Sequence, residues 1–215
     1  MEIQFDSRVV ELLCARLCHD VIGPVAAINN GVELVTEIGD EMQGEALELI
    51  GESAKKASDL IQLYRMAFGP ARGADGTGAD LDDARARAIE ALASDRIVVD
   101  WPAIAGGEDA DMPSMAVKLI INMVILAVEV LPGSGEVAVR VEPGASWRAE
   151  ITARKEGFSL APNFSAVFDD EASIDDLTPR TVLAYLTRSL AAAAGDGLVV
   201  DSGDGFVSFQ ANIST

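Results

Sequence analysis

The chain is poor in the side chains that most often bind metals. Its 215 residues include one histidine, His19, and two cysteines, Cys14 and Cys18. A tetrahedral zinc site takes about four such ligands, so His19 has too few partners to form one. The spacing of Cys14, Cys18 and His19 also has one residue too many between the cysteines for a haem-attachment motif. We therefore expect no resident metal, and two thiols four residues apart on a helix favour buried packing in a reducing compartment.

Basic residues are scarce as well. Lysine and arginine number 16 against 35 aspartates and glutamates, a formal net charge of -19. Such a surface repels nucleic acid and anionic membranes, so we expect neither as a partner; solvated helix faces are the plainer explanation of the acidity. The longest apolar stretch, residues 119–131, is interrupted by Asn122 and Glu129 and is too short to span a bilayer. Residues 1–6 have neither a basic region nor an apolar signal core, so a cytoplasmic location is predicted.

Two long helices are predicted at the N-terminal end. Ser7 can cap the first, which ends at 39–40, and the second runs from about residue 41 to 68 before a Gly-Pro stop. Apolar residues recur at steps of three or four along both, as in a coiled coil: Cys14, Leu17, Val21, Val25, Ile28, Val32 and Val35, then Leu47, Ile50, Ala54, Ala57, Ile61, Tyr64 and Phe68.

A hairpin of this length cannot cover both apolar seams by itself. Pairing two hairpins into a four-helix bundle does so, and we therefore predict a homodimer built on residues 1–69. The alternative is that both helices pack on the rest of the same chain. A linker rich in glycine and alanine follows at 70–80.

The pattern changes in residues 81–215, which predict an α/β sandwich with helices on one face of a small, mainly antiparallel sheet, so that the whole chain is an α+β protein. Helices are expected at 81–94 (capped by Asp80), 113–130 and 178–194. Strands are expected at 96–101, 136–142, 147–154, 198–201 and 206–213, the last two joined by a tight turn at 202–205.

The histidine lies in the segment CHDVIGP, residues 18–24, within the first long helix. At 100° per residue, His19 lies well over 90° from the seam, so it faces water or a visiting partner. Asp20 can fix the ring tautomer through Nδ1, which leaves Nε2 as the nucleophile. Gly23 leaves room beside the ring, and Arg16 can attract phosphoryl oxygens.

This segment resembles the phospho-accepting box of histidine-kinase dimerisation domains, and residues 81–215 resemble the kinase ATP-binding fold in their order of elements. Residues 118–124 look like the helix whose asparagine, here Asn122, helps hold magnesium; a buried helix with one polar residue is the alternative. The Asp-x-Gly-x-Gly box is missing, because residues 155–158 read Lys-Glu-Gly-Phe, and residues 201–205 are better explained as a turn. No glycine-rich lid, P-loop or GxGxxG replaces it, and the acidic run at 169–171 would repel triphosphate.

A kinase-like dimer with a defective nucleotide site resembles the ChpT-type histidine phosphotransferases of alphaproteobacteria, most specifically over residues 17–31. That resemblance implies that His19 accepts a phosphoryl group from the receiver aspartate of a hybrid kinase (CckA-like) and passes it to response regulators (CtrA- or CpdR-like), with Asp20 supporting. It implies phosphotransfer through a phosphohistidine without ATP-dependent kinase activity. Gly23 stands where kinase relatives often carry a polar residue used in dephosphorylation, which argues against phosphatase activity.

The expected docking surface surrounds His19, and magnesium is expected to come from the receiver. Its predicted residues are Leu12, Ala15, Arg16, Ile22, Gly23, Ala26, Tyr64 and Arg65. Two alternatives stay open: an active histidine kinase that binds ATP in an unusual pocket, and a dimeric receiver-binding scaffold with no chemistry.

Overall fold

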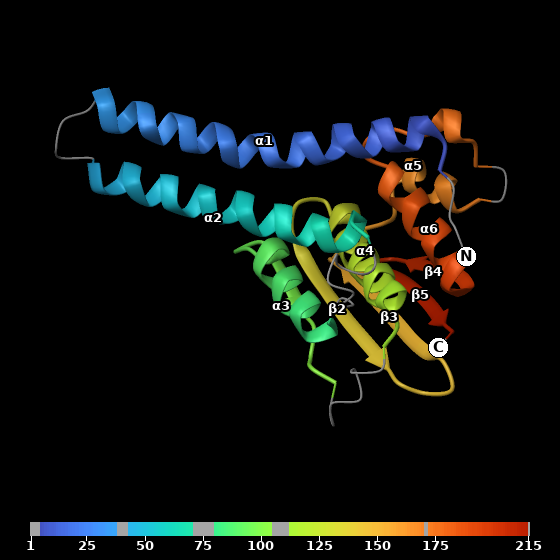
Figure 1. The fold of residues 1–215 in the computed structure, drawn as a ribbon. Helices are drawn as coiled ribbons and strands as arrows, with labels where there is room; N and C mark the ends of the chain where they lie inside the picture. Colours follow the sequence, from blue (N-terminus) through green and yellow to red (C-terminus); the bar gives the residue numbers. More distant parts are fainter. Residues whose placement is uncertain (1–4, 38–42, 71–79, 105–111, 170–171, 215) are drawn as a thin grey trace.

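The computed structural model describes residues 5–37, 43–70, 80–104, 112–169 and 172–214. Two long helices, α1 (Ser7–Glu37) and α2 (Gln43–Phe68), run antiparallel and lie against a mixed helix and sheet portion (Figure 1). The first helix is capped by Asp6 rather than by Ser7, because the Asp6 carboxylate accepts the Arg8 backbone N–H at 2.8 Å. The predicted turn at 39–40 lies outside the described residues.

The two helices approach each other closely at Gly31. A Cβ atom on Gly31 would lie 2.6 Å from Ile50 Cγ1, so only glycine fits between the helices there. The apolar seam predicted for α1 divides between two faces: Leu17, Val21, Ile28 and Val35 are partly buried, whereas Cys14, Val25 and Val32 are exposed.

The seam predicted for α2 likewise divides between a buried and an exposed face of the single chain. The helix buries Ala46, Ser53, Ala57, Leu60, Leu63 and Ala67. Leu47 and Ile61, two residues of the predicted seam, are 56% and 53% exposed. Cys14 and Cys18, which were predicted to be buried, are both free and exposed in the single chain.

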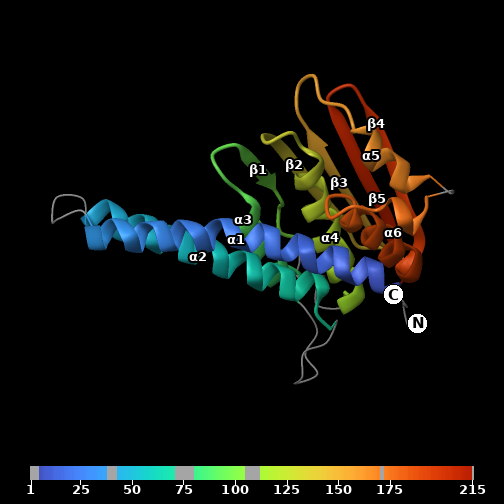
Figure 2. The same ribbon diagram turned by 90° about the horizontal axis from the view of Figure 1, so that it is seen from above.

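The remaining elements form a sheet covered on one face by helices, as predicted (Figures 1 and 2). In chain order they are α3 (Leu81–Leu92), β1 (Ile97–Asp100), α4 (Ser114–Val130), β2 (Gly135–Glu142), β3 (Trp147–Arg154), α5 (Pro162–Ser165), the 3-10 turns η3 (Ala166–Phe168) and η4 (Ile174–Asp176), α6 (Val182–Ala194), β4 (Gly195–Gly203) and β5 (Phe206–Ile213).

The sheet has the order β1-β2-β3-β5-β4, with β1 parallel to β2 and every other pair antiparallel. Asp80 caps α3 as predicted, accepting the backbone N–H groups of Asp82 and Asp83 at 2.7 and 3.1 Å. Gly205, with φ +80°, makes the tight turn between β4 and β5. The last helix begins at Val182 rather than 178, because Thr178 and Thr181 close a turn before it: the Thr178 N–H donates to Thr181 Oγ1 at 3.0 Å.

One hydrophobic core joins the sheet to the hairpin through α4, which is almost completely buried. Val9 of α1 and Leu60, Leu63 and Ala67 of α2 belong to that core. The other end of the hairpin projects beyond the sheet portion (Figures 1 and 2). One end of the hairpin therefore packs on the rest of the same chain, which was the alternative to dimerisation. Apolar side chains along the rest of the hairpin are exposed. No helix in the described ranges is both long and apolar enough to cross a bilayer.

Candidate functional site

His19 stands on the outer surface of α1, and its side chain is 84% exposed, in agreement with the periodicity of the helix. Its Nδ1 atom lies 3.3 Å from Asp20 Oδ1. One turn further along, a Cβ on Gly23 would meet nothing within 4 Å. The ring is thus held from its Nδ1 side and leaves Nε2 open to a partner.

The Asp20 carboxylate accepts hydrogen bonds from two side chains. The Tyr64 hydroxyl donates to Asp20 Oδ2 at 2.6 Å, and Arg16 Nε donates to the same oxygen at 2.7 Å. Burial alone would raise the pKa of Asp20, but the hydrogen bonds from Tyr64 and Arg16 outweigh burial and lower it. Asp20 is therefore an anion at neutral pH, and it can only accept a proton shared with His19 Nδ1.

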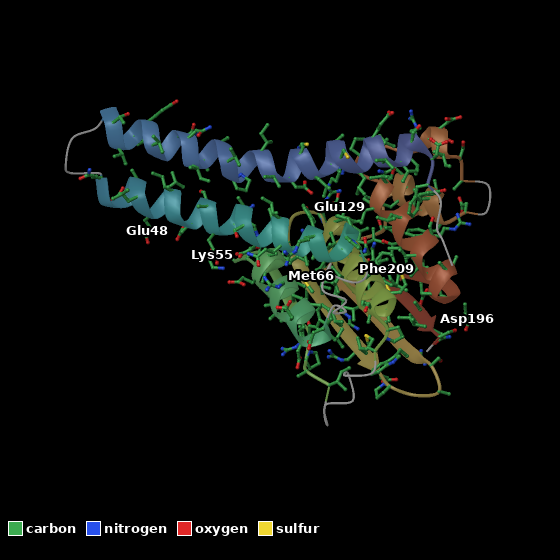
Figure 3. All side chains as sticks on the ribbon, in the orientation of Figure 1. Glu48, Lys55, Met66, Glu129, Asp196 and Phe209 are labelled. Atoms are coloured by element: carbon green, nitrogen blue, oxygen red, sulfur yellow. The ribbon has the colours of Figure 1, made fainter. Side chains whose placement is uncertain are left out.

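Arg16 connects this cluster to the α/β portion through Glu129, near the end of α4 (Figure 3). The Arg16 and Glu129 side chains are 13% and 16% exposed. Burial alone would lower the pKa of Arg16, yet its contacts with Glu129 and Asp20 raise it above its ordinary value. Two of its nitrogens are engaged by these two carboxylates and Nη1 is buried, so this arrangement gives no sign that Arg16 attracts phosphoryl oxygens, and that role stays a prediction.

Tyr64, predicted as a docking residue, is bound to Asp20 in the structure, and its docking role stays a prediction. It is half-buried, its hydroxyl is bound to Asp20, and its ring lies 5.5 Å from that of Phe68 between centroids. Burial and the hydrogen bond to Asp20 raise the pKa of Tyr64. Tyr64 therefore positions Asp20 from α2 and offers little surface to a partner.

The other predicted docking residues differ in their exposure. Ile22 is 65% exposed, which is unusual for a large apolar side chain. Leu12 is partly buried and packs against the hydrophobic core. The remaining members of the set are exposed: Ala15, Gly23, Ala26 and Arg65.

A cleft of about 560 Å³ lies beside His19. The α1 side of the cleft is formed by Ala15, Arg16, His19 and Asp20, and the α/β side by Glu129, Pro179 and Arg180. The hairpin and the C-terminal portion therefore share this hollow. No group of three or more His, Cys, Asp or Glu side chains suited to a metal occurs in the part of the chain that the structure describes.

Asn122, the candidate magnesium-binding residue, is completely buried. Its Nδ2 donates to the carbonyls of Ala67 in α2 and Lys118 in α4, at 2.9 and 2.8 Å. Lys118 in turn donates to the carbonyl of Gly69 at 2.8 Å. Asn122 Oδ1, the atom that would bind a nucleotide-bound metal, is enclosed in the core and has no hydrogen-bond partner among the described residues. This burial agrees with the alternative of a buried helix carrying one polar residue.

Known proteins with similar sequences show the family of this chain. The model of the histidine phosphotransferase C-terminal domain matches residues 81–205. The protein phosphotransferase ChpT of Brucella abortus (strain 2308) is 36% identical over 185 residues, which cover 86% of this chain and 85% of that protein. This chain belongs to the histidine phosphotransferase family.

One solved structure agrees with membership in the histidine phosphotransferase family. A bacterial phosphotransferase superposes with a TM-score of 0.80 at 30% identity, over 98% of both chains. A histidine kinase domain from Erythrobacter litoralis gives a TM-score of 0.47 at 14% identity, over 88% of this chain and 95% of that one. The function of the chain is accordingly histidine phosphotransfer in a phosphorelay.

Sequence reasoning missed Glu129 and Arg180 as parts of the site. The sequence did indicate that Glu129 has a polar or charged partner, because a buried carboxylate in an otherwise apolar helix requires one. That partner, Arg16, lies 113 positions away, so no local pattern could name it. Arg180 carried no signal in the sequence, since it lies in an irregular segment before α6.

Proposed function

We propose that His19 accepts a phosphoryl group from the aspartyl phosphate of a receiver domain and passes it to the aspartates of response regulators. The observation that carries this proposal is the 84% exposed imidazole whose Nδ1 faces an ionised Asp20. It gives the chain a nitrogen nucleophile with a fixed tautomer and a free approach.

In the first transfer, the Nε2 lone pair attacks phosphorus and the bond from phosphorus to the aspartyl oxygen breaks. The aspartate leaves as a carboxylate, and the ring becomes a phosphorylated imidazolium that keeps its Nδ1 proton. Asp20 then faces a positive ring at 3.3 Å and stabilises it. Reversal of these steps delivers the group to a second receiver, so no net proton transfer is needed.

We propose that the receiver supplies the Mg²⁺ that neutralises charge during in-line transfer. The complete burial of Asn122 supports this division of labour. The rival function, ATP-dependent autophosphorylation, requires a nucleotide site that the buried amide does not offer. Mg²⁺-dependent ATP binding at micromolar strength would favour that rival.

The proposed docking surface is the face of α1 around His19, centred on Ile22. A 65% exposed isoleucine flanked by Ala15 and Ala26 gives a small apolar centre for a receiver helix to cover. Arg65 lies exposed on α2 as a rim charge. We propose that the acidity of the rest of the surface selects among receivers by repulsion.

We propose that the chain acts as a homodimer through a four-helix bundle. Exposed Cys18, Val25 and Val32 recur every seven residues on α1, and exposed Leu47, Ala54 and Ile61 do so on α2. A seven-residue repeat is the period of a coiled-coil seam. On α1 this seam lies about 100° or more from His19, so dimerisation leaves the nucleophile accessible.

A transfer assay tests the proposed activity. A panel of receivers is phosphorylated with ³²P and mixed with wild-type chain or with His19→Gln. We expect acid-labile label on the wild type, none on His19→Gln, and onward movement of label to a second receiver. The proposal would be overturned if His19→Gln still took up label. It would also be overturned if the wild type bound receivers but took label from none of them, and that second result would favour the receiver-binding scaffold with no chemistry.

Size-exclusion chromatography with light scattering tests the dimer. Val25→Asp with Val32→Asp should give a folded monomer by circular dichroism, because two carboxylates per chain would be buried in the bundle. Ile22→Asp is the matched control: it should remain dimeric and weaken receiver binding at least tenfold. A dimer that survives the double change would exclude this seam.

A further inference from the structure

The cleft beside His19 is formed by two parts of the chain that sequence-based reasoning treated as separate domains. His19 and Asp20 come from α1, while Pro179 and Arg180 come from the segment between η4 and α6. A group held on Nε2 of His19 projects at the edge of a hollow of about 560 Å³. The α/β portion therefore has side chains close to the place where phosphoryl transfer would occur.

The two arginines that line this cleft differ in how closely carboxylates hold them. Arg16 is buried and engaged by both Asp20 and Glu129. Arg180 is 74% exposed, and its Nε lies 4.0 Å from Glu129 Oε1, beyond hydrogen-bond distance. Of the described residues that line the cleft, Arg180 thus carries the guanidinium that is not already fixed by a carboxylate.

We infer that Arg180 binds the phosphoryl oxygens of phosphorylated His19 and of the group in transit. The inference rests on the proposed phosphotransfer at His19 and assigns the C-terminal portion a direct part in it. The guanidinium presents several N–H donors in one plane, a geometry that matches two phosphoryl oxygens at once. Arg180 forms only hydrogen bonds and an ion pair with the phosphoryl oxygens. No covalent bond of Arg180 forms or breaks, so the transfer step is the one described above.

Glu129 explains why Arg180 stays near the cleft without being locked there. At 4.0 Å and with an exposed side chain, the attraction between Arg180 and Glu129 is weak. A dianionic phosphoryl group attracts the guanidinium more strongly than one carboxylate that Arg16 already neutralises. Arg180 can therefore move to the phosphoryl group at little cost.

The first test compares Arg180→Ala, Arg180→Lys and the wild type in single-turnover transfer from a phosphorylated receiver. We expect the maximal rate to fall about tenfold or more in Arg180→Ala, with partial recovery in Arg180→Lys and a receiver Kd changed less than threefold. Arg148→Ala, which removes an exposed arginine from β3 outside this cleft, is the control and should match the wild type. A rate for Arg180→Ala within twofold of wild type would overturn the inference.

The second test needs no receiver. Full-length chain is phosphorylated with potassium phosphoramidate, and the phosphohistidine signal is titrated by ³¹P NMR. Because a guanidinium favours the dianion, the phosphoryl group should titrate about half a pH unit lower in the wild type than in Arg180→Ala.

Equal titrations would overturn the inference, and so would a loss of receiver affinity in Arg180→Ala with an unchanged maximal rate, since that result makes Arg180 a docking residue. Failure of every receiver to label the wild type would instead overturn the proposed function. The phosphoramidate titration would then still decide whether Arg180 contacts a phosphoryl group on His19.

Discussion

The hydroxyl of Tyr64 lies 2.6 Å from Oδ2 of Asp20, so the second long helix directly holds the residue next to the imidazole. Arg16 shares the same Asp20 oxygen and reaches Glu129 of α4 with its other end. The orientation of the exposed ring of His19 is therefore coupled, through Asp20, to both α2 and the α/β portion. Four predictions follow from this coupling and from the packing of the hairpin.

Replacing Asp20 with asparagine should slow phosphotransfer about 10- to 100-fold. The side chain keeps its shape, but the phosphorylated imidazolium loses the negative charge that faces its Nδ1 proton. Single-turnover transfer measured in a quench-flow instrument checks this. Asp59→Asn, which removes a carboxylate paired with Lys55 elsewhere on α2, should leave the rate unchanged. An Asp20→Asn rate equal to wild type would show that the ring needs no anionic partner.

Replacing Glu129 with alanine should destabilise the fold by about 2–3 kcal/mol. The change removes one of the two carboxylates that bind the buried Arg16 guanidinium, and the loss of a hydrogen bond to a buried charged group is costly even though Asp20 remains as a partner. Urea unfolding followed by circular dichroism measures the difference. Glu48→Ala, at an exposed position of α2, is the control and should change stability by less than about 0.5 kcal/mol. Similar losses in the two variants would mean that the Arg16–Glu129 pair contributes nothing specific.

Local patterns in the sequence predicted most elements of the fold, because caps, turns and apolar periodicity are properties of neighbouring residues. As expected, Asp80 caps α3, the Gly69-Pro70 pair ends α2, and a tight turn containing Gly205 joins the last two strands. Periodicity was insufficient for the two long helices, which carry apolar residues on more than one face. A step of three or four cannot tell which face meets the same chain, and the predicted seam of α1 therefore combined partly buried Leu17 with exposed Cys14 and Val25.

Of the geometry of the site, the sequence predicted the exposure of His19 but not the contacts of the residues around it. His19 and Asp20 are adjacent in a recognisable segment, and helical geometry places the ring outside the seam. The partners of Asp20 are set by tertiary packing: Tyr64 lies 44 positions away from it along the chain, and Glu129 reaches Asp20 through Arg16. Arg16 was accordingly predicted as a free cation for phosphate, whereas the structure places it between two carboxylates.

The two glycines of α1 should respond to alanine in opposite directions. Gly23→Ala should stabilise the protein by about 0.5–1 kcal/mol, because its Cβ enters open space and alanine favours the helix. Gly31→Ala should destabilise it by about 1–2 kcal/mol, because the Cβ would lie 2.6 Å from Ile50 Cγ1 and 3.2 Å from the Ala46 carbonyl oxygen. Thermal unfolding of the two variants side by side measures this, and a rise in Tm for both would contradict the close approach of the helices.

The phenol of Tyr64 should stay protonated at a pH where a free tyrosine, with a pKa of about 10, ionises. Burial and the hydrogen bond to anionic Asp20 raise its pKa, so its contribution to stability is complete below about pH 10 and is lost as the pH rises above that value. The absorbance at 295 nm of wild type minus Tyr64→Phe should therefore show no tyrosinate at pH 10.5 while the protein is folded. The two variants should differ by about 1–2 kcal/mol in unfolding free energy at pH 7, and that difference should shrink at alkaline pH. A Tyr64 signal that appears at the pH of a free tyrosine would mean that its hydroxyl is not bound to Asp20 in solution.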